Sequence, residues 1–157
     1  MAEIADPENT LIMETTKGKV VIKLLPETAP EHVARIKELA RENFYDNIVF
    51  HRVIDSFMAQ TGDPTGTGMG GSDKPDLKAE FSDTSHVRGT CSMARSQNPN
   101  SANSQFFICF EDAPWLNKQY SVWGQVIDGM DNVDKIKRGE PVRDPDSIVS
   151  MRVAADV

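Results

Sequence analysis

The chain has 157 residues, with 17 lysines and arginines against 24 aspartates and glutamates, and a formal net charge of -7. A chain of this length is most simply one domain spanning 1–157, with residues 1–10 as a flexible extension, and it can bury roughly 68 to 70% of its unfolded surface without cross-links. The acidic balance disfavours a long-range positive field, so we expect neither nucleic acid nor a membrane as a partner.

The two cysteines, Cys91 and Cys109, are too few for a disulfide framework and match no metal-ligand spacing. We therefore expect reduced thiols, no metal site and no cofactor. The acidic, polar N-terminal residues lack the basic start and apolar stretch of a secretory signal, and no apolar run is long enough for a membrane span. These features predict a cytoplasmic protein.

The first 45 residues predict two strands and a helix. Strand-like runs at 11–16 and 19–25 flank Lys17-Gly18, a plausible hairpin break. Thr28 and Glu31 then have the spacing of a capping box, with a proline in the first turn. A helical apolar stripe follows and predicts a helix that ends near Asn43; its members are Val33, Ile36, Leu39, Ala40 and Phe44.

Two short apolar runs, 50–54 and 57–63, flank the polar pair Asp55-Ser56 and predict two neighbouring strands joined by a tight turn. Because successive side chains on a strand point to opposite faces, His51 and Arg52 cannot both enter one site, whereas Met58 and Gln60 share a face. An arginine beside such residues suggests hydrogen-bond donation and not proton abstraction. On this evidence alone, an exposed arginine on a strand is the commoner outcome.

Residues 61–88 are rich in glycine and proline and predict a long loop. Within it, residues 66–71 satisfy the GxGxxG pattern of dinucleotide sites. The following residues, Ser72 to Asp76, include Pro75 and cannot continue as the helix that would hold a pyrophosphate. Glycines that permit tight turns are therefore the favoured interpretation over a nucleotide site.

The second half of the chain predicts four more strands, at 89–95, 106–110, 121–127 and 148–154, with a polar loop at 96–103. Met130, Val133 and Ile136 mark a second short helix, and Gly139 is well placed beyond its end. The total of about eight strands and two helices predicts a mainly β protein. Periodicity alone leaves a barrel and a sandwich both open.

Several blocks resemble the signature blocks of cyclophilins in order and in spacing: residues 50–54, Phe57-Met58-Ala59-Gln60, residues 104–108 and Trp115-Leu116. The resemblance covers about residues 11–155. It implies a closed eight-stranded antiparallel β-barrel capped by two α-helices, and the activity of a peptidyl-prolyl cis-trans isomerase, which accelerates rotation about Xaa-Pro bonds and assists protein folding.

The resemblance also implies the site. It assigns a catalytic set of Arg52, Gln60 and Phe57, in which Gln60 orients either Arg52 or the substrate carbonyl. The implied substrate-binding positions are Met58, Gly66, Arg95, Ser96, Gln105, Phe107, Trp115, Leu116 and Tyr120. Three features depart from common relatives: Arg95 and Tyr120 replace Asn and His, and the loop between Arg95 and Gln105 is one residue longer. The family contact at Arg95 is largely through the backbone.

As a member of this family the protein is expected to act on proline-containing peptides and on unfolded or folding proteins, as a monomer. Trp115 resembles the position that favours cyclosporin binding, since an indole N–H can donate to a ligand carbonyl. A non-catalytic module that holds proline-containing segments in the same groove is the alternative. The three histidines are scattered without metal-ligand spacing and are interpreted as structural.

Overall fold

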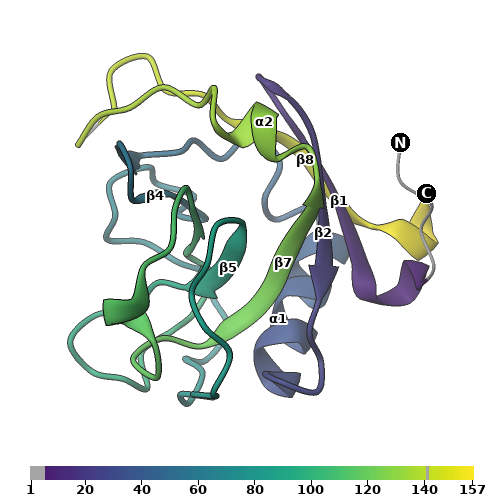
Figure 1. Cartoon of the computed structure of the whole chain (residues 1–157). Coiled ribbons are helices and arrows are strands. Elements are labelled where there is room, and N and C mark those ends of the chain that lie inside the picture. Colours follow the sequence, from purple (N-terminus) through teal and green to yellow (C-terminus); the bar gives the residue numbers. More distant parts are fainter. Residues whose placement is uncertain (1–5, 141) are drawn as a thin grey trace.

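The computed structural model describes residues 6–140 and 142–157. A curved antiparallel sheet accounts for most of the regular structure (Figure 1). The strands are β1 (Thr10–Thr15), β2 (Gly18–Leu24), β3 (Arg52–Ile54), β4 (Met58–Thr61), β5 (Thr90–Met93), β6 (Phe106–Cys109), β7 (Val122–Asp128) and β8 (Ile148–Val153); the helices are α1 (Pro30–Arg41) and α2 (Met130–Val133), with 3-10 turns at Pro7–Asn9, Pro114–Leu116 and Ala154–Asp156.

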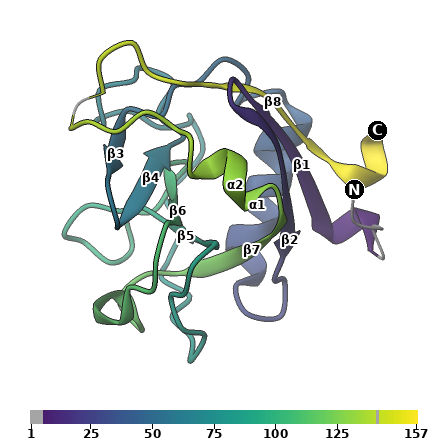
Figure 2. The ribbon, with the colours of Figure 1, turned by 45° about the horizontal axis from the view of Figure 1, so that its top comes forward.

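The eight strands form one sheet in the order β3-β4-β6-β5-β7-β2-β1-β8, which confirms the predicted eight-stranded antiparallel architecture. Closure is less complete than predicted, because the edge strands β3 and β8 do not pair with each other in the described part of the chain. Residues 47–50 fill this gap: Asn47 N–H donates to Ile148 O over 2.7 Å, and Phe50 N–H donates to Asp146 O over 2.8 Å. The result is the curved half-barrel in Figure 2.

Side chains from the concave face of the sheet, joined by Tyr45 from the segment after α1, fill the interior. Tyr45, Phe106 and Trp123 are fully buried and meet edge to face, with ring centroids 5.5 Å apart for Tyr45 and Phe106 and 5.2 Å apart for Phe106 and Trp123. Edge-to-face contacts align the positive rim of one ring with the negative face of the next. The interior is therefore a packed core, and a ligand site has to lie elsewhere on the sheet.

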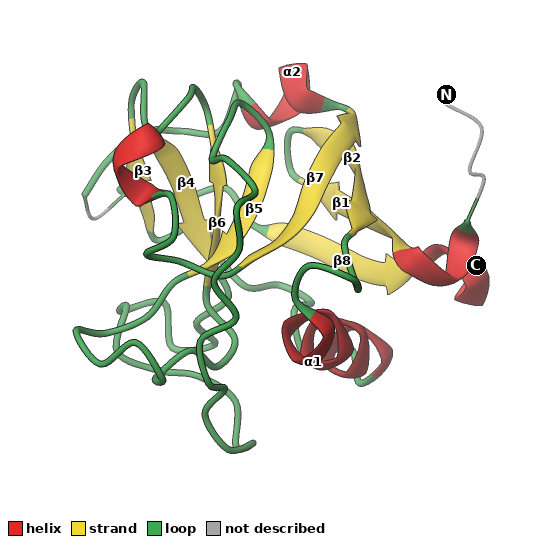
Figure 3. Cartoon of the chain, turned by 60° about the horizontal axis from the view of Figure 1, so that its bottom comes forward, coloured by secondary structure: helices red, strands yellow, loops and turns green. Residues whose placement is uncertain are grey.

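Helix α1 and helix α2 lie at opposite ends of the curved sheet (Figure 3). The apolar stripe of α1 is buried as predicted from Val33 to Ala40, whereas Phe44 lies beyond the helix and is only partly buried. Asn43, with φ 60, adopts the left-handed conformation just beyond the helix. The predicted capping box is wrong, because α1 begins at Pro30 without a side-chain cap from Thr28 or Ala29. Glu80 of the long loop caps it instead, and its carboxylate accepts from His32 N–H (2.8 Å) and Glu31 N–H (3.2 Å).

The remaining differences from prediction concern the ends of the chain. Helix α2 is shorter than expected, and Ile136 is buried but lies beyond it. The part of the predicted flexible extension that the structure describes is ordered: Pro7–Asn9 form a 3-10 turn and Thr10 already belongs to β1. Residues 1–5 lie outside the described part. Neither helix in residues 6–140 and 142–157 is long and apolar enough to cross a membrane.

Candidate active site

One row of paired residues crosses four neighbouring strands. Arg52 of β3 pairs with Gln60 of β4, Gln60 pairs with Phe107 of β6, and Phe107 pairs with Ser92 of β5. Residues in register across a sheet point to the same face. Phe107 belongs to a small apolar cluster separate from the main core, whereas its neighbours Phe106 and Ile108 belong to the core. The row therefore lies on the convex face of the sheet.

The alternation predicted for His51 and Arg52 is confirmed. His51 is buried, and the ring lies under the glycine loop, where a Cβ on Gly68 would be 3.6 Å from it. Arg52 is half-buried and lines the convex face. Met58 and Gln60 line the same cavity, as their spacing requires.

A cavity of about 210 Å³ opens beside Arg52, and we call it the apolar cavity after the apolar side chains that form one of its walls. Most predicted site residues meet there: Arg52, Phe57, Met58, Gln60, Arg95, Phe107, Leu116 and Tyr120 line it, together with Ala94. Met58, Phe107 and Leu116 are buried and form its apolar wall. A small concavity that combines an apolar wall with several polar side chains suits a compact apolar ring next to polar groups.

Phe107 is held in place by two rings. The imidazole of His86 stacks against it with centroids 6.2 Å apart and an interplanar angle of 19°, and Tyr120 meets it edge to face at 5.6 Å. His86 is itself fixed by a 3.0 Å hydrogen bond between its Nε2 and Ser92 Oγ. Burial lowers the pKa of His86 and outweighs its hydrogen bond to Asn117, so the imidazole is neutral at neutral pH.

The guanidinium of Arg52 has two acceptors among the described residues. Its Nη1 donates to Gln60 Oε1 over 3.1 Å and its Nε donates to Glu140 Oε2 over 2.5 Å. Its Nη2 makes no hydrogen bond to any residue that the structure describes. Gln60 thus orients Arg52 in this structure, which is one of the two roles considered for it. Glu140 was missed by the sequence analysis because no motif links it to Arg52.

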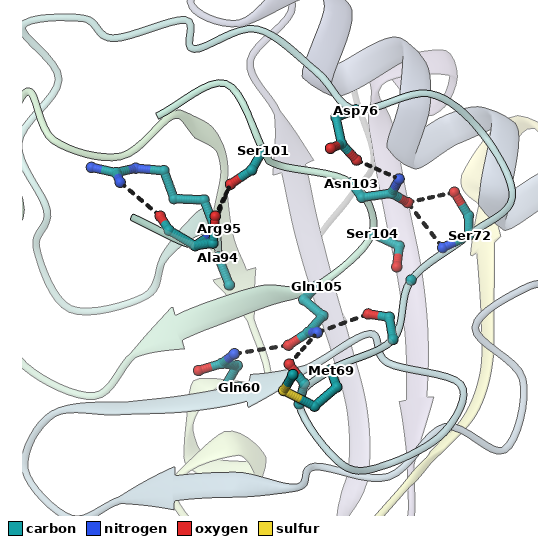
Figure 4. Close-up of a pocket in the computed structure, with 14 residues that line it drawn as sticks. Gln60, Met69, Ser72, Asp76, Ala94, Arg95, Ser101, Asn103, Ser104 and Gln105 are labelled. Atoms are coloured by element: carbon teal, nitrogen blue, oxygen red, sulfur yellow. Dashed lines mark hydrogen bonds between the residues drawn. The ribbon is translucent and has the colours of Figure 1, made fainter. Parts of the chain in front are cut away.

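A second cavity of about 460 Å³, lined mainly by glycines and polar side chains, adjoins the first and shares Gln60, Ala94 and Arg95 with it (Figure 4). Of the predicted residues, Ser96 and Gln105 also line it. The others come from two loops and were missed: Gly68, Met69, Gly70, Gly71, Ser72, Asp76, Ser101, Asn103 and Ser104. Only the folded path of the long loop brings residues 68–76 to this wall.

Arg95 stands between the two cavities. Its Nε and Nη2 donate to Gln119 O over 3.0 and 2.7 Å, and its Nη1 donates to Ser96 O over 3.0 Å. The guanidinium carbon lies 4.7 Å from the centroid of the Tyr120 ring, which is a cation–π distance. Its side chain, and not only its backbone, therefore shapes both cavities.

The glycine loop at 66–71 is organised around a buried carboxylate. Asp63 Oδ2 accepts from Gly68 N–H and Gly70 N–H over 2.6 and 3.1 Å, and Oδ1 accepts from Thr65 N–H over 2.8 Å. Burial alone would raise the pKa of Asp63, but the hydrogen bonds from Thr65, Gly70 and Gly68 hold it well below its usual range. Because Asp63 occupies these donors, the loop does not present them to a phosphate.

Two predicted positions line neither cavity. A Cβ on Gly66 would face Val49, 3.3 Å away. Trp115 is 62% exposed and its ring centroid lies 5.7 Å from that of Phe57, at the edge of the apolar cavity. Among the described residues, no group of three or more His, Cys, Asp or Glu side chains could hold a metal ion.

Comparison with known proteins decides the family. The family model described as cyclophilin type peptidyl-prolyl cis-trans isomerase/CLD matches residues 10–153. The chain belongs to the cyclophilins. It is 53% identical to a Brucella suis protein named "Probable peptidyl-prolyl cis-trans isomerase", over 99% of this chain and 87% of that protein. It is 39% identical to the peptidyl-prolyl cis-trans isomerase of Synechococcus elongatus, over 92% of this chain and 96% of the relative.

The fold of this chain also matches those of solved cyclophilin structures. Cyclophilin AquaCyp293 from Hirschia baltica superposes with a TM-score of 0.90 at 32% identity, covering 97% of this chain and 76% of that one. A Cryptosporidium parvum cyclophilin solved in the presence of the dipeptide Ala-Pro superposes with a TM-score of 0.85 at 29% identity, covering 92% of this chain and 98% of that one. This cyclophilin is a peptidyl-prolyl cis-trans isomerase that acts on proline-containing peptides.

Proposed function

We propose that Arg52 is the catalytic donor of the isomerase and that the apolar cavity beside it receives the proline ring. The bond before proline rotates over a barrier of roughly 18 to 20 kcal/mol, because resonance gives it partial double-bond character. No covalent bond has to break during rotation. A group that stabilises the twisted amide more than the planar one lowers the barrier.

The orientation of the Arg52 guanidinium carries this proposal. Gln60 and Glu140 engage Nη1 and Nε, while Nη2 has no partner among the described residues and the side chain lines the apolar cavity. A proline ring against Met58, Phe107 and Leu116 would bring its nitrogen near this donor. As that nitrogen becomes pyramidal its lone pair localises and accepts a hydrogen bond, so the interaction strengthens near the transition state.

Substitution of Arg52 tests the proposal. Arg52→Ala removes the donor, and we expect kcat/KM for an uncharged Ala-Pro peptide to fall about 10²- to 10³-fold, or about 2.7 to 4 kcal/mol, as for other directed donors. Arg88→Ala is the matched control, because Arg88 is similarly exposed and forms its ion pair with Asp134 away from the cavity. Near-unchanged turnover in Arg52→Ala would refute the role. Peptide binding by the wild type without accelerated exchange would favour the binding-module alternative.

We propose in addition that cyclosporin inhibits this cyclophilin through Trp115. The exposed indole lies beside Phe57 at the edge of the apolar cavity, where its N–H can donate to a ligand carbonyl. Trp115→Phe keeps an aromatic ring and removes the donor, so we expect inhibition to weaken by about 2- to 10-fold, which is the contribution of one hydrogen bond. Equal inhibition of the wild type and Trp115→Phe by cyclosporin would show that the indole N–H of Trp115 does not contribute to binding.

The cellular setting is likewise a proposal: a single-domain, monomeric, cytoplasmic protein that assists folding of other chains. The two free, buried cysteines suit a reducing compartment. Sedimentation of the purified chain tests the monomer, and localisation of a tagged chain tests the compartment. Acceleration of a proline-limited refolding reaction tests the assistance to folding.

A further inference from the structure

Glu140 is held opposite Arg52 by the backbone. Val53 N–H donates to Gly139 O, and Gly139 N–H donates to Val53 O, both over 2.8 Å, so the two residues form an antiparallel bridge. In an antiparallel pair the residue before Val53 faces the residue after Gly139. These two residues are Arg52 and Glu140. Their contact follows from backbone register and not only from the reach of two long side chains.

The segment that carries Glu140 is anchored on its other side by Arg138. Nη1 of Arg138 donates to Asp134 O and Ile136 O over 2.6 and 2.7 Å, and its Nε pairs with Asp55 over 3.1 Å. Its guanidinium carbon lies 4.1 Å from the centroid of the Phe110 ring. The backbone before Glu140 is therefore fixed against the sheet independently of Arg52.

The carboxylate of Glu140 supplies the second point of attachment for the guanidinium. Gln60 alone, on Nη1, would leave the planar group free to swing about that contact. With Glu140 on Nε as well, two acceptors on two different nitrogens define both the position and the plane of the guanidinium. The nitrogen left over is Nη2.

We propose that Glu140 is a positioning residue for Arg52, which holds the guanidinium in the plane that presents Nη2 to the substrate. This inference rests on the proposed role of Arg52. The pair is partly exposed, with side-chain exposures of 40% for Arg52 and 59% for Glu140, so its effect is expected to be modest and sensitive to salt.

Glu140→Gln tests the inference, because the amide is nearly isosteric with the carboxylate but uncharged. With an uncharged Ala-Pro peptide at low ionic strength we expect kcat/KM to fall about two- to fivefold, within the range for exposed ion pairs. The loss should lie mainly in kcat, as for an interaction made in the transition state. Raising the ionic strength should lower the wild-type value toward that of the variant and leave the variant unchanged.

Glu42→Gln is the matched control. It makes the same substitution at a similarly exposed glutamate, which pairs with Lys74 and touches neither Arg52 nor the segment that carries Glu140. We expect its kcat/KM and salt dependence to match those of the wild type. An equal loss in Glu42→Gln would overturn the inference, because a general loss of one negative charge would then explain both results.

A double-mutant cycle separates this inference from the role of Arg52. If Glu140 acts through Arg52, Glu140→Gln should have no further effect in an Arg52→Ala background. The same loss in both backgrounds would overturn the inference, as would unchanged activity in Glu140→Gln alone while Arg52→Ala is impaired. Unchanged activity in Arg52→Ala would overturn the catalytic role and this inference together.

Discussion

Gln60 and Gln105 are joined by a hydrogen bond of 2.9 Å in which Gln60 Nε2 donates to Gln105 Oε1. Gln105 Nε2 in turn donates to the carbonyl oxygens of Gly68 and Gly70 over 3.0 and 2.9 Å (Figure 4). Each amide has a donor end and an acceptor end. This series of hydrogen bonds therefore turns the carbonyl oxygen of Gln60 toward Arg52. The glycine loop thereby sets the orientation of the proposed catalytic group.

Gln105→Leu should reduce activity without removing any proposed catalytic group. Gln60 Nε2 loses its acceptor, and the orientation of Gln60 toward Arg52 is no longer enforced. We expect kcat/KM to fall about 2- to 10-fold, the equivalent of one hydrogen bond of about 0.5 to 1.5 kcal/mol, and so by less than in Arg52→Ala. Peptide-exchange kinetics measure the effect. Gln97→Leu, at an exposed position of the loop at 96–103, is the control, and a loss as large in Gln97→Leu would contradict the relay.

Asp63→Ala should destabilise the protein. The variant leaves the N–H groups of Thr65, Gly68 and Gly70 without their acceptor, and we expect the free energy of unfolding to fall by about 2 to 4 kcal/mol. Urea denaturation measures the change. Asp73→Asn, at an exposed position of the same loop, should change it by less than about 0.5 kcal/mol. If Asp63→Ala changed the free energy of unfolding by as little as Asp73→Asn, the prediction would be wrong, and water would then replace the carboxylate as acceptor.

Stability should fall as the pH drops below about 6.5. Burial lowers the pKa of His51, with Asp63 opposing and Arg52 reinforcing the shift, and burial also lowers the pKa of His86. The unfolded chain therefore binds more protons than the folded one from the ordinary histidine pKa of 6.5 downward, so acid favours unfolding. The stability from the neutral imidazoles is fully present above pH 6.5 and is lost as the pH falls through the lowered folded values.

Denaturant titrations at pH 7.5 and pH 5.5 measure this loss. His51→Phe keeps a buried ring but removes one titrating group, so the difference in unfolding free energy between the two pH values should shrink in this variant. Asp63, Asp46 and Asp134, whose pKa values lie below the ordinary aspartate value, titrate at lower pH and leave this window unaffected. If the difference in unfolding free energy between pH 7.5 and pH 5.5 were as large in His51→Phe as in the wild type, His51 would not contribute to the loss of stability in acid.

The two thiols should not react in the folded protein. Burial raises the pKa of Cys91 strongly and raises that of Cys109 to about 12, so the reactive thiolate is scarce and both sulfurs are shielded from reagent. We expect iodoacetamide at pH 8 to modify neither cysteine in the native protein and both in denaturant, as read by mass spectrometry. Rapid native labelling of either cysteine would contradict the buried placement.

The sequence by itself determined the strands, the helix stripe, the family and most of the apolar cavity. Residues 50–63 form local structure in which period-two alternation correctly separated His51 from Arg52 and placed Met58 and Gln60 on one face. The resemblance to cyclophilins then selected Arg52 for that face. Phe107, Leu116 and Tyr120 were assigned by resemblance, and the cavity brings them to the same place.

Only the tertiary structure decided which distant groups complete these local elements. Glu80 caps α1 by accepting from His32 N–H, 48 residues earlier in the sequence, and Glu140 accepts from Arg52, 88 residues earlier. Asp63 accepts hydrogen bonds from backbone N–H groups of the glycine loop. Side-chain periodicity is a property of neighbouring residues, whereas these contacts depend on how the sheet curves and on the register in which its edges meet. That register is fixed by long-range backbone hydrogen bonds, such as those between Val53 and Gly139, for which no local pattern in the sequence provides a signal.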